Sequence, residues 1–182
     1  VKDGSDIAIF AYGHTVDWAM QVSAMFEKES VSVAVINARF AKPVDKELVV
    51  QYANSARCLI TTEEHSLKGG FGSAVLEALQ EEQVYDVPVK CIGLDDIVLE
   101  HGAPGKQRKD LKLDPEGMFE TIMKFYESVA EMVASGDGKK RVSGNGNKAV
   151  GADGNKPAHP RNGQKRILTV KQTLNEIGRA SC

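Results

Sequence analysis

The sequence predicts an α/β fold in which helices cover a largely parallel sheet. Short apolar runs alternate with segments of helical spacing, from the N-terminus to about residue 135. The apolar runs lack alternating polar residues, as is typical of strands buried on both faces of a sheet. Apolar residues make up 42% and charged residues 26% of the chain, as in ordinary globular domains.

Each element follows from a local pattern. Asp45 is placed to cap the second helix, and Asp114 with Pro115 is placed to start the last one. The strands are expected at 6–12, 31–37, 57–62 and 87–94. The helices are expected at 15–30, 45–56, 75–83, shortly after 99–104, and at 114–135.

The character of the chain changes after Ser135. Residues 1–135 carry 13 basic and 22 acidic residues, a net charge of -9, whereas residues 136–182 carry 10 and 3, a net charge of +7. The tail is rich in Gly, Asn and Lys, which predicts disorder, with the spacing of a short helix at 167–177. This tail is either a docking peptide or sequence foreign to the domain. The acidic body gives no support for nucleic-acid binding.

Cysteine usage and hydropathy indicate the cellular setting. Cys58, Cys91 and Cys182 fit no zinc-binding spacing, and their odd number argues against a disulfide framework. No apolar run approaches the roughly 18 residues that span a bilayer. We therefore expect a cytoplasmic protein without a membrane partner.

A glycine loop at 69–72 separates the third expected strand from its helix. The dinucleotide-binding fingerprint G-x-G-x-x-G starts correctly at Gly70 and Gly72 but has Val75 in place of its third glycine. The phosphate-binding motif G-x-x-x-x-G-K-[ST] is missing from this loop as well. The loop is therefore expected to turn the chain, and the N–H groups of the following helix remain available to an anion or a carboxylate.

Charged residues lie at the ends of the expected strands. Glu63 and Glu64 are adjacent, so on a strand they point to opposite faces and cannot act together on one substrate. Salt bridges or interface contacts are the better interpretation. His65 and His101 are expected in loops after strands, without a Ser or Cys partner at suggestive spacing. Arg39 follows a buried strand and is suited to pairing with a carboxylate across an interface.

Four stretches occur together in a fixed order. They are NARFAKPVD (37–45), TTEEHSLKGGFGSAV (61–75), LEHGAP (99–104) and LKLDPEGM (111–118). As a set they resemble the C-terminal domain of the 1-deoxy-D-xylulose-5-phosphate synthase family, which is related to transketolase. The resemblance covers roughly residues 1–130. Transketolases and the β subunits of 2-oxo-acid dehydrogenases share the fold and resemble these stretches less closely.

The resemblance implies a particular architecture. It is a three-layer α/β/α sandwich with a five-stranded, mostly parallel sheet that contains one antiparallel strand. In this family a strand usually precedes the one expected at 6–12, so the sequence is expected to begin near the end of that first strand. Members usually end soon after the last helix, which makes the tail at 136–182 a departure from the family.

The resemblance also implies where the chemistry resides. In the family, thiamine diphosphate and Mg²⁺ bind between two earlier domains, and the C-terminal domain supports dimerisation. We therefore expect this chain to bind neither cofactor and to hold no catalytic residue. Its expected partners are the preceding catalytic domains of the same chain and a second subunit of a homodimer. The residues that match the family pattern, and are expected at interfaces or behind the active site, are Arg39, Glu63, Glu64, Gly70, Phe71, Gly72 and His101.

Two other interpretations stay open at this point. The basic tail and its end helix fit a stand-alone interaction module with no catalytic parent. The glycine loop fits, more weakly, a flavodoxin-like nucleotide-binding domain. Whether His65 or His101 reaches an active site formed with other domains also stays open.

Overall fold

The fold was analysed in a computed structural model of the chain, which describes residues 1–135. Residues 1–129 form one compact unit, and the last turn of helix α5 belongs to a second unit. The tail at 136–182 and its predicted helix lie outside the described residues, so the domain boundary at 135 stays a prediction.

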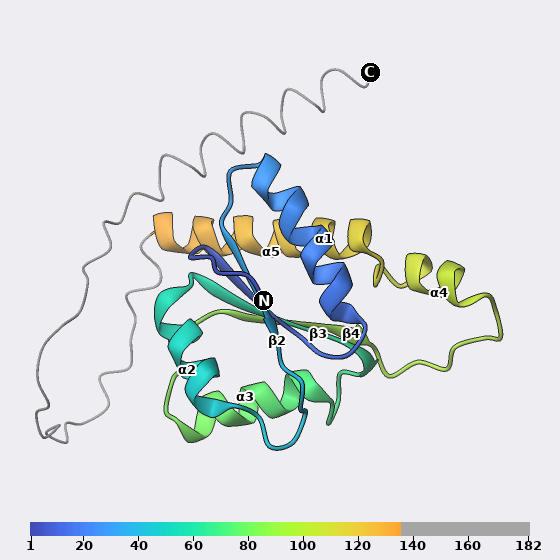
Figure 1. Cartoon of the computed structure of the whole chain (residues 1–182), viewed down its shortest axis with the longest axis horizontal. Coiled ribbons are helices and arrows are strands. Elements are labelled where there is room, and N and C mark those ends of the chain that lie inside the picture. Colours follow the sequence, from blue (N-terminus) through green and yellow to red (C-terminus); the bar gives the residue numbers. More distant parts are fainter. Residues whose placement is uncertain (136–182) are drawn as a thin grey trace, which may run out of the picture. The chain divides into compact units, whose positions relative to one another are not determined.

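The described residues form nine elements in the order β-α-β-α-β-α-β-α-α (Figure 1). The strands are β1 (Ile7–Ala11), β2 (Val33–Asn37), β3 (Cys58–Ser66) and β4 (Val89–Leu94). The helices are α1 (Thr15–Lys28), α2 (Lys46–Ser55), α3 (Phe71–Glu81), α4 (Pro104–Asp110) and α5 (Pro115–Ala134).

All four strands are parallel, in the order β2-β1-β3-β4. This confirms the predicted α/β class. The expected count of five strands is wrong for the described residues, because the antiparallel strand is reduced to one bridge between Lys2 and Val35. Within the described residues, Lys2 and Val35 form this bridge through two backbone hydrogen bonds of 3.1 and 2.9 Å.

Helices cover both faces of the sheet within this unit. Figure 1 shows α2 and α3 on one face and α1 with α5 on the other. The aromatic rings of Phe26 in α1 and Phe119 in α5 meet at a centroid distance of 4.8 Å. The core beneath α2 and α3 is formed by Ala8, Phe10, Ala34, Ile36, Val49, Leu59, Phe71, Val75 and Leu79.

The predicted helix caps are present. The side chain of Asp45 accepts a hydrogen bond from the backbone N–H of Leu48 at 3.0 Å, which satisfies a free donor in the first turn of α2. Asp114 accepts one from the N–H of Gly117 at 3.1 Å, at the start of α5. None of the described helices is long and apolar enough to cross a lipid bilayer.

Candidate functional site

The carboxyl ends of β1 and β3 form the topological switch point of the sheet. The chain leaves β1 toward β2 on one side and returns to β3 on the other side. Open α/β sheets bind ligands in the crevice at such a point. The sequence-predicted glutamates and the glycine loop both lie at this edge, which we therefore treat as the candidate site.

The carboxylate of Glu63 is hydrogen-bonded to the N-terminus of α3. Its side chain is 1% exposed, and its two carboxylate oxygens accept hydrogen bonds from the N–H groups of Phe71 at 2.7 Å and Gly72 at 2.8 Å. The partial positive charge at a helix N-terminus favours this arrangement. The helix donors that a bound phosphate would need are thus already bonded to a carboxylate of the chain itself.

The glycine loop makes this contact possible. Gly69 has a positive φ of 73°, which turns the chain between β3 and α3. A Cβ atom at Gly70 would overlap the carboxylate of Glu63 and the carbonyl oxygen of Ser66. A Cβ atom at Gly72 would lie 2.7 Å from Oγ1 of Thr61. The loop turns the chain and lets the helix approach the strand, as the sequence predicts.

Glu64 points to the opposite face of β3, also as predicted. Its carboxylate lies 3.2 Å from Nδ1 of His14 and 3.2 Å from Nε of Arg108. The guanidinium carbon of Arg108 in turn lies 5.2 Å from the centre of the Trp18 ring. Glu64 therefore joins the loop after β1 to helix α4, and its predicted role in salt bridges is found here.

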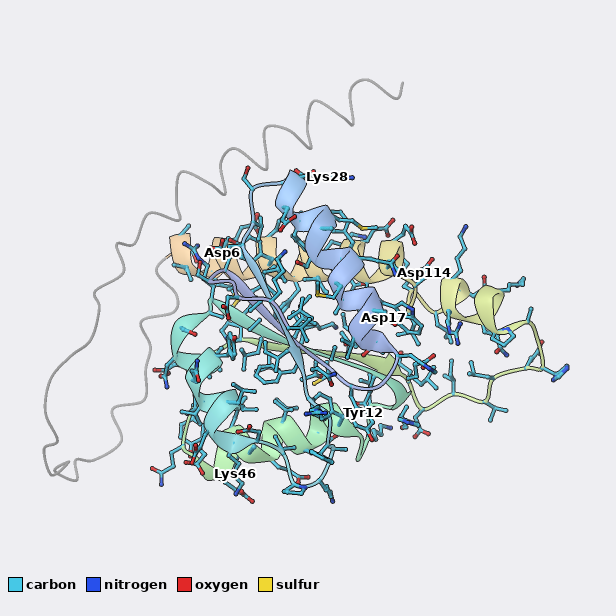
Figure 2. The ribbon with its side chains drawn as sticks, in the orientation of Figure 1. Asp6, Tyr12, Asp17, Lys28, Lys46 and Asp114 are labelled. Atoms are coloured by element: carbon cyan, nitrogen blue, oxygen red, sulfur yellow. The ribbon has the colours of Figure 1, made fainter. Side chains whose placement is uncertain are left out.

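Aromatic side chains connect the end of β1 with the start of α3. Figure 2 shows Tyr12 beyond the end of β1, on the side of α3. Its ring stacks on that of Phe71 with a centroid distance of 5.6 Å and meets the ring of His65 at 6.4 Å. His65 is exposed and belongs to β3, so the expectation that it lies in a loop is wrong. The strand continues through its polar end because it pairs with β4 as far as Ser66.

Arg39 and His101 lie in the loops after β2 and β4, and within the described residues neither side chain is bonded to Glu63 or Glu64. Arg39 is exposed in the loop after β2, beside Phe40, whose side chain is 65% exposed. Both residues line a hollow of about 290 Å³ together with residues of α2 and Phe71. His101 is exposed in the loop between β4 and α4. The structure therefore does not gather the seven sequence-predicted residues into one site.

Three residues of this edge carry no clear functional signal in the sequence. Arg108 lies in a charged segment that is typical of solvated surface, and Trp18 is most simply core or interface packing. No signal in the sequence joins these two residues, because they are far apart along the chain. Tyr12 is the last residue of the strand expected at 6–12.

The described residues do not fit thiamine diphosphate with Mg²⁺. The N–H groups of Phe71 and Gly72 are bonded to Glu63, and that of Gly69 is bonded to Oγ of Ser73. No group of three or more His, Cys, Asp or Glu residues in the described part of the chain is arranged to hold a metal ion. We derive no chemical step through either group from this chain.

Known proteins resemble this chain along most of the described residues. Residues 1–118 match the family described as the transketolase C-terminal domain. The 1-deoxy-D-xylulose-5-phosphate synthase of Thermosynechococcus vestitus is 49% identical over 123 residues, which is 68% of this chain and 19% of that protein. The enzyme of the same name from Halothermothrix orenii is 39% identical over 130 residues, 71% of this chain and 20% of that protein.

One solved structure extends the comparison to the fold. It is described as a split gene transketolase, inactive beta4 tetramer, and it matches with a TM-score of 0.63 and 34% sequence identity. The match covers 68% of this chain and 40% of that chain. The chain spans about a fifth of the length of the curated relatives it matches. The shared sequence over residues 1–118 and the shared parallel sheet show that this chain belongs to the transketolase C-terminal domain family.

Proposed function

We propose that this chain is the C-terminal domain of a 1-deoxy-D-xylulose-5-phosphate synthase. The complete enzyme would condense pyruvate with glyceraldehyde 3-phosphate and release carbon dioxide, using thiamine diphosphate and Mg²⁺ bound by other domains. The product feeds isoprenoid synthesis in the cytoplasm. The observation that carries the proposal is the 49% identity to a protein of that name over two thirds of this chain.

In this proposal the domain braces the enzyme and performs no chemistry of its own. The carboxyl edge supports this role, because the groups that a small ligand would use are bonded within the domain. Glu63 is bonded to α3, and Glu64 is paired with His14 and Arg108. The preceding catalytic domains and a second subunit are the proposed partners.

Two loops at this edge have the chemistry of an interface. The loop after β2 presents the exposed ring of Phe40 beside Arg39, whose guanidinium has no partner among the described residues. The loop after β4 presents Val98, which is 98% exposed, next to Ile97. Exposed aromatic, arginine and aliphatic side chains are the residue types that interface cores favour.

A chimeric enzyme tests this proposal. Residues 1–135 of this chain replace the corresponding C-terminal fifth of the Thermosynechococcus vestitus synthase, and the product is quantified together with the dimer fraction from light scattering. We expect a dimer whose activity lies within about tenfold of that of the unaltered enzyme. The control is the same enzyme with its C-terminal fifth removed, which should lose both properties.

Two outcomes contradict the proposal. One is a folded chimera that stays monomeric and inactive, like the truncated control. The other is turnover by this chain alone when it is supplied with pyruvate, glyceraldehyde 3-phosphate, thiamine diphosphate and Mg²⁺. The split gene transketolase named above, an inactive beta4 tetramer, supports the expectation of no turnover.

A further inference from the structure

The segment from the end of β4 to the end of α4 is largely exposed, although its loop contains several apolar residues. Its loop at 95–103 contains the consecutive apolar residues Ile97, Val98 and Leu99, which are 54%, 98% and 40% exposed. Helix α4 has no buried residue. Apolar burial therefore does little to hold this segment in place, and another interaction must fix its orientation.

Arg108 supplies that interaction. Its Nε donates a hydrogen bond to Oε1 of Glu64 at 3.2 Å, and its guanidinium covers the Trp18 ring at 5.2 Å. Within the described residues, all ion-pair, side-chain hydrogen-bond and ring contacts from 97–110 to the sheet and to α1 come from this one side chain. The segment has one other side-chain bond to the described rest of the domain, the exposed ion pair of Asp96 with Lys68 at 3.1 Å, in the loop after β3. Its remaining side-chain bonds are internal, such as that from Gln107 to the carbonyl of Glu100 at 2.7 Å.

The geometry suits arginine in particular. A planar guanidinium can donate to a carboxylate at its edge while its face lies on an indole ring. The other oxygen of Glu64 lies 3.2 Å from Nδ1 of His14, and Glu64 itself is part of the paired strand β3. Trp18 is half-buried on α1, which packs against the sheet. Both contacts of Arg108 thus belong to the rigid part of the domain.

We propose that Arg108 is a positioning residue that clamps α4 and the apolar loop 95–103 against the carboxyl edge of the sheet. The clamp holds Ile97, Val98 and Leu99 in one orientation before any partner meets them. Such preorganisation reduces the conformational entropy lost when the loop packs against another surface. The inference goes beyond the proposed function, since it concerns this chain on its own.

The test uses the whole chain and two readouts. Trp18 is the only tryptophan in the sequence, so intrinsic fluorescence reports directly on the ring beneath Arg108. Hydrogen–deuterium exchange of peptides covering 104–113 reports on opening of α4. Arg108→Ala removes both contacts, and Lys109→Ala is the matched control, with the same loss of charge on the same helix.

For Arg108→Ala we expect about tenfold faster exchange over 104–113, consistent with losing one partly exposed ion pair and one cation–π contact. We also expect a red shift of the Trp18 emission and stronger quenching by acrylamide. Arg108→Lys keeps the charge but not the planar group, so its exchange rate should lie between those of the parent chain and Arg108→Ala. Lys109→Ala should match the parent chain in both readouts.

The proposal is overturned if Arg108→Ala keeps both the parent exchange rate within twofold and the parent emission. It is also overturned if Lys109→Ala accelerates exchange as much as Arg108→Ala. Far-UV circular dichroism shows that each variant is folded, and Arg108→Lys provides a second variant if the alanine variant is not. Neither readout needs a partner or a cofactor, so failure here leaves the chimera experiment unaffected.

Discussion

Replacing Glu63 by Gln tests whether the buried carboxylate holds β3 and α3 together. Gln has the same shape, so its carbonyl oxygen can still accept one hydrogen bond from Phe71 or Gly72. Its NH₂ group then faces the other N–H, which leaves two donors opposed in a buried place. The loss is one charge-assisted bond, about 1.5–3 kcal/mol, and a favourable charge at the helix N-terminus, about 0.5–2 kcal/mol.

These terms sum to about 2–5 kcal/mol, a large part of the roughly 5–15 kcal/mol that stabilises a typical domain. At about 3 °C per kcal/mol for this size, the Tm should fall by about 6–15 °C. Urea denaturation followed by circular dichroism gives the free energy directly, with an unchanged slope as the sign of a simple loss of stability. Glu64→Gln is the control, because the partly exposed ion pair of Glu64 with Arg108 should contribute less than about 1 kcal/mol. If the two variants lose equal stability, or if Glu63→Gln loses less than about 0.5 kcal/mol, the reasoning is refuted.

Three further predictions concern packing, capping and ionisation. Gly72→Ala should lower the free energy of unfolding by about 1–3 kcal/mol in the same urea experiment, since its Cβ would lie 2.7 Å from Oγ1 of Thr61 and 2.9 Å from Sγ of Cys91. An unchanged free energy would contradict this and show that α3 can shift away from β3. Asp45→Ala should lower the free energy of unfolding by about 1 kcal/mol through loss of the α2 cap, and Asp45→Asn should keep most of that stability. An equal loss of stability in both variants would exclude capping as the cause. Burial, with a smaller effect of the charge of Asp6, raises the pKa of the Cys58 thiol from 9.0 to about 12, so the unfolded chain loses this proton first as the pH rises. Ionisation of Cys58 therefore leaves the free energy of unfolding unchanged below pH 9 and lowers it by about 1.4 kcal/mol per pH unit between 9 and 12. Urea midpoints of the parent chain and of Cys58→Ala that stay parallel from pH 8 to 10.5 would contradict this.

The fold could be predicted because its elements are set by local patterns. β1 is buried along its whole length, and its run of apolar residues has no competing helical interpretation. The last residues of β3 could not be predicted in the same way, because the polar sequence of His65 and Ser66 resembles a loop. Their strand conformation depends on pairing with β4 and on the donors of α3, which are tertiary features.

The candidate site was only partly accessible to sequence reasoning. The opposite orientation of Glu63 and Glu64 follows from the period of a strand, and the structure confirms it. The partners of the two glutamates do not follow from any period. Arg108 is 44 residues away from Glu64, and a charged helix without buried residues gives no indication of which side chain turns inward.

The contacts on the two faces of β3 are consistent with the proposed role of this domain as a brace. In a ligand-binding α/β domain, the free donors of a helix N-terminus and the charged ends of the strands remain available for the ligand. Here the carboxylate of Glu63 satisfies the helix, and the guanidinium of Arg108 satisfies Glu64, so each group at the edge stabilises the domain itself. Binding an anion at α3 would require expelling Glu63 from a buried position where it has two hydrogen bonds. The loops that follow β2 and β4 also lie at this edge and expose apolar side chains. Burying these side chains against a protein surface lowers their free energy relative to contact with water.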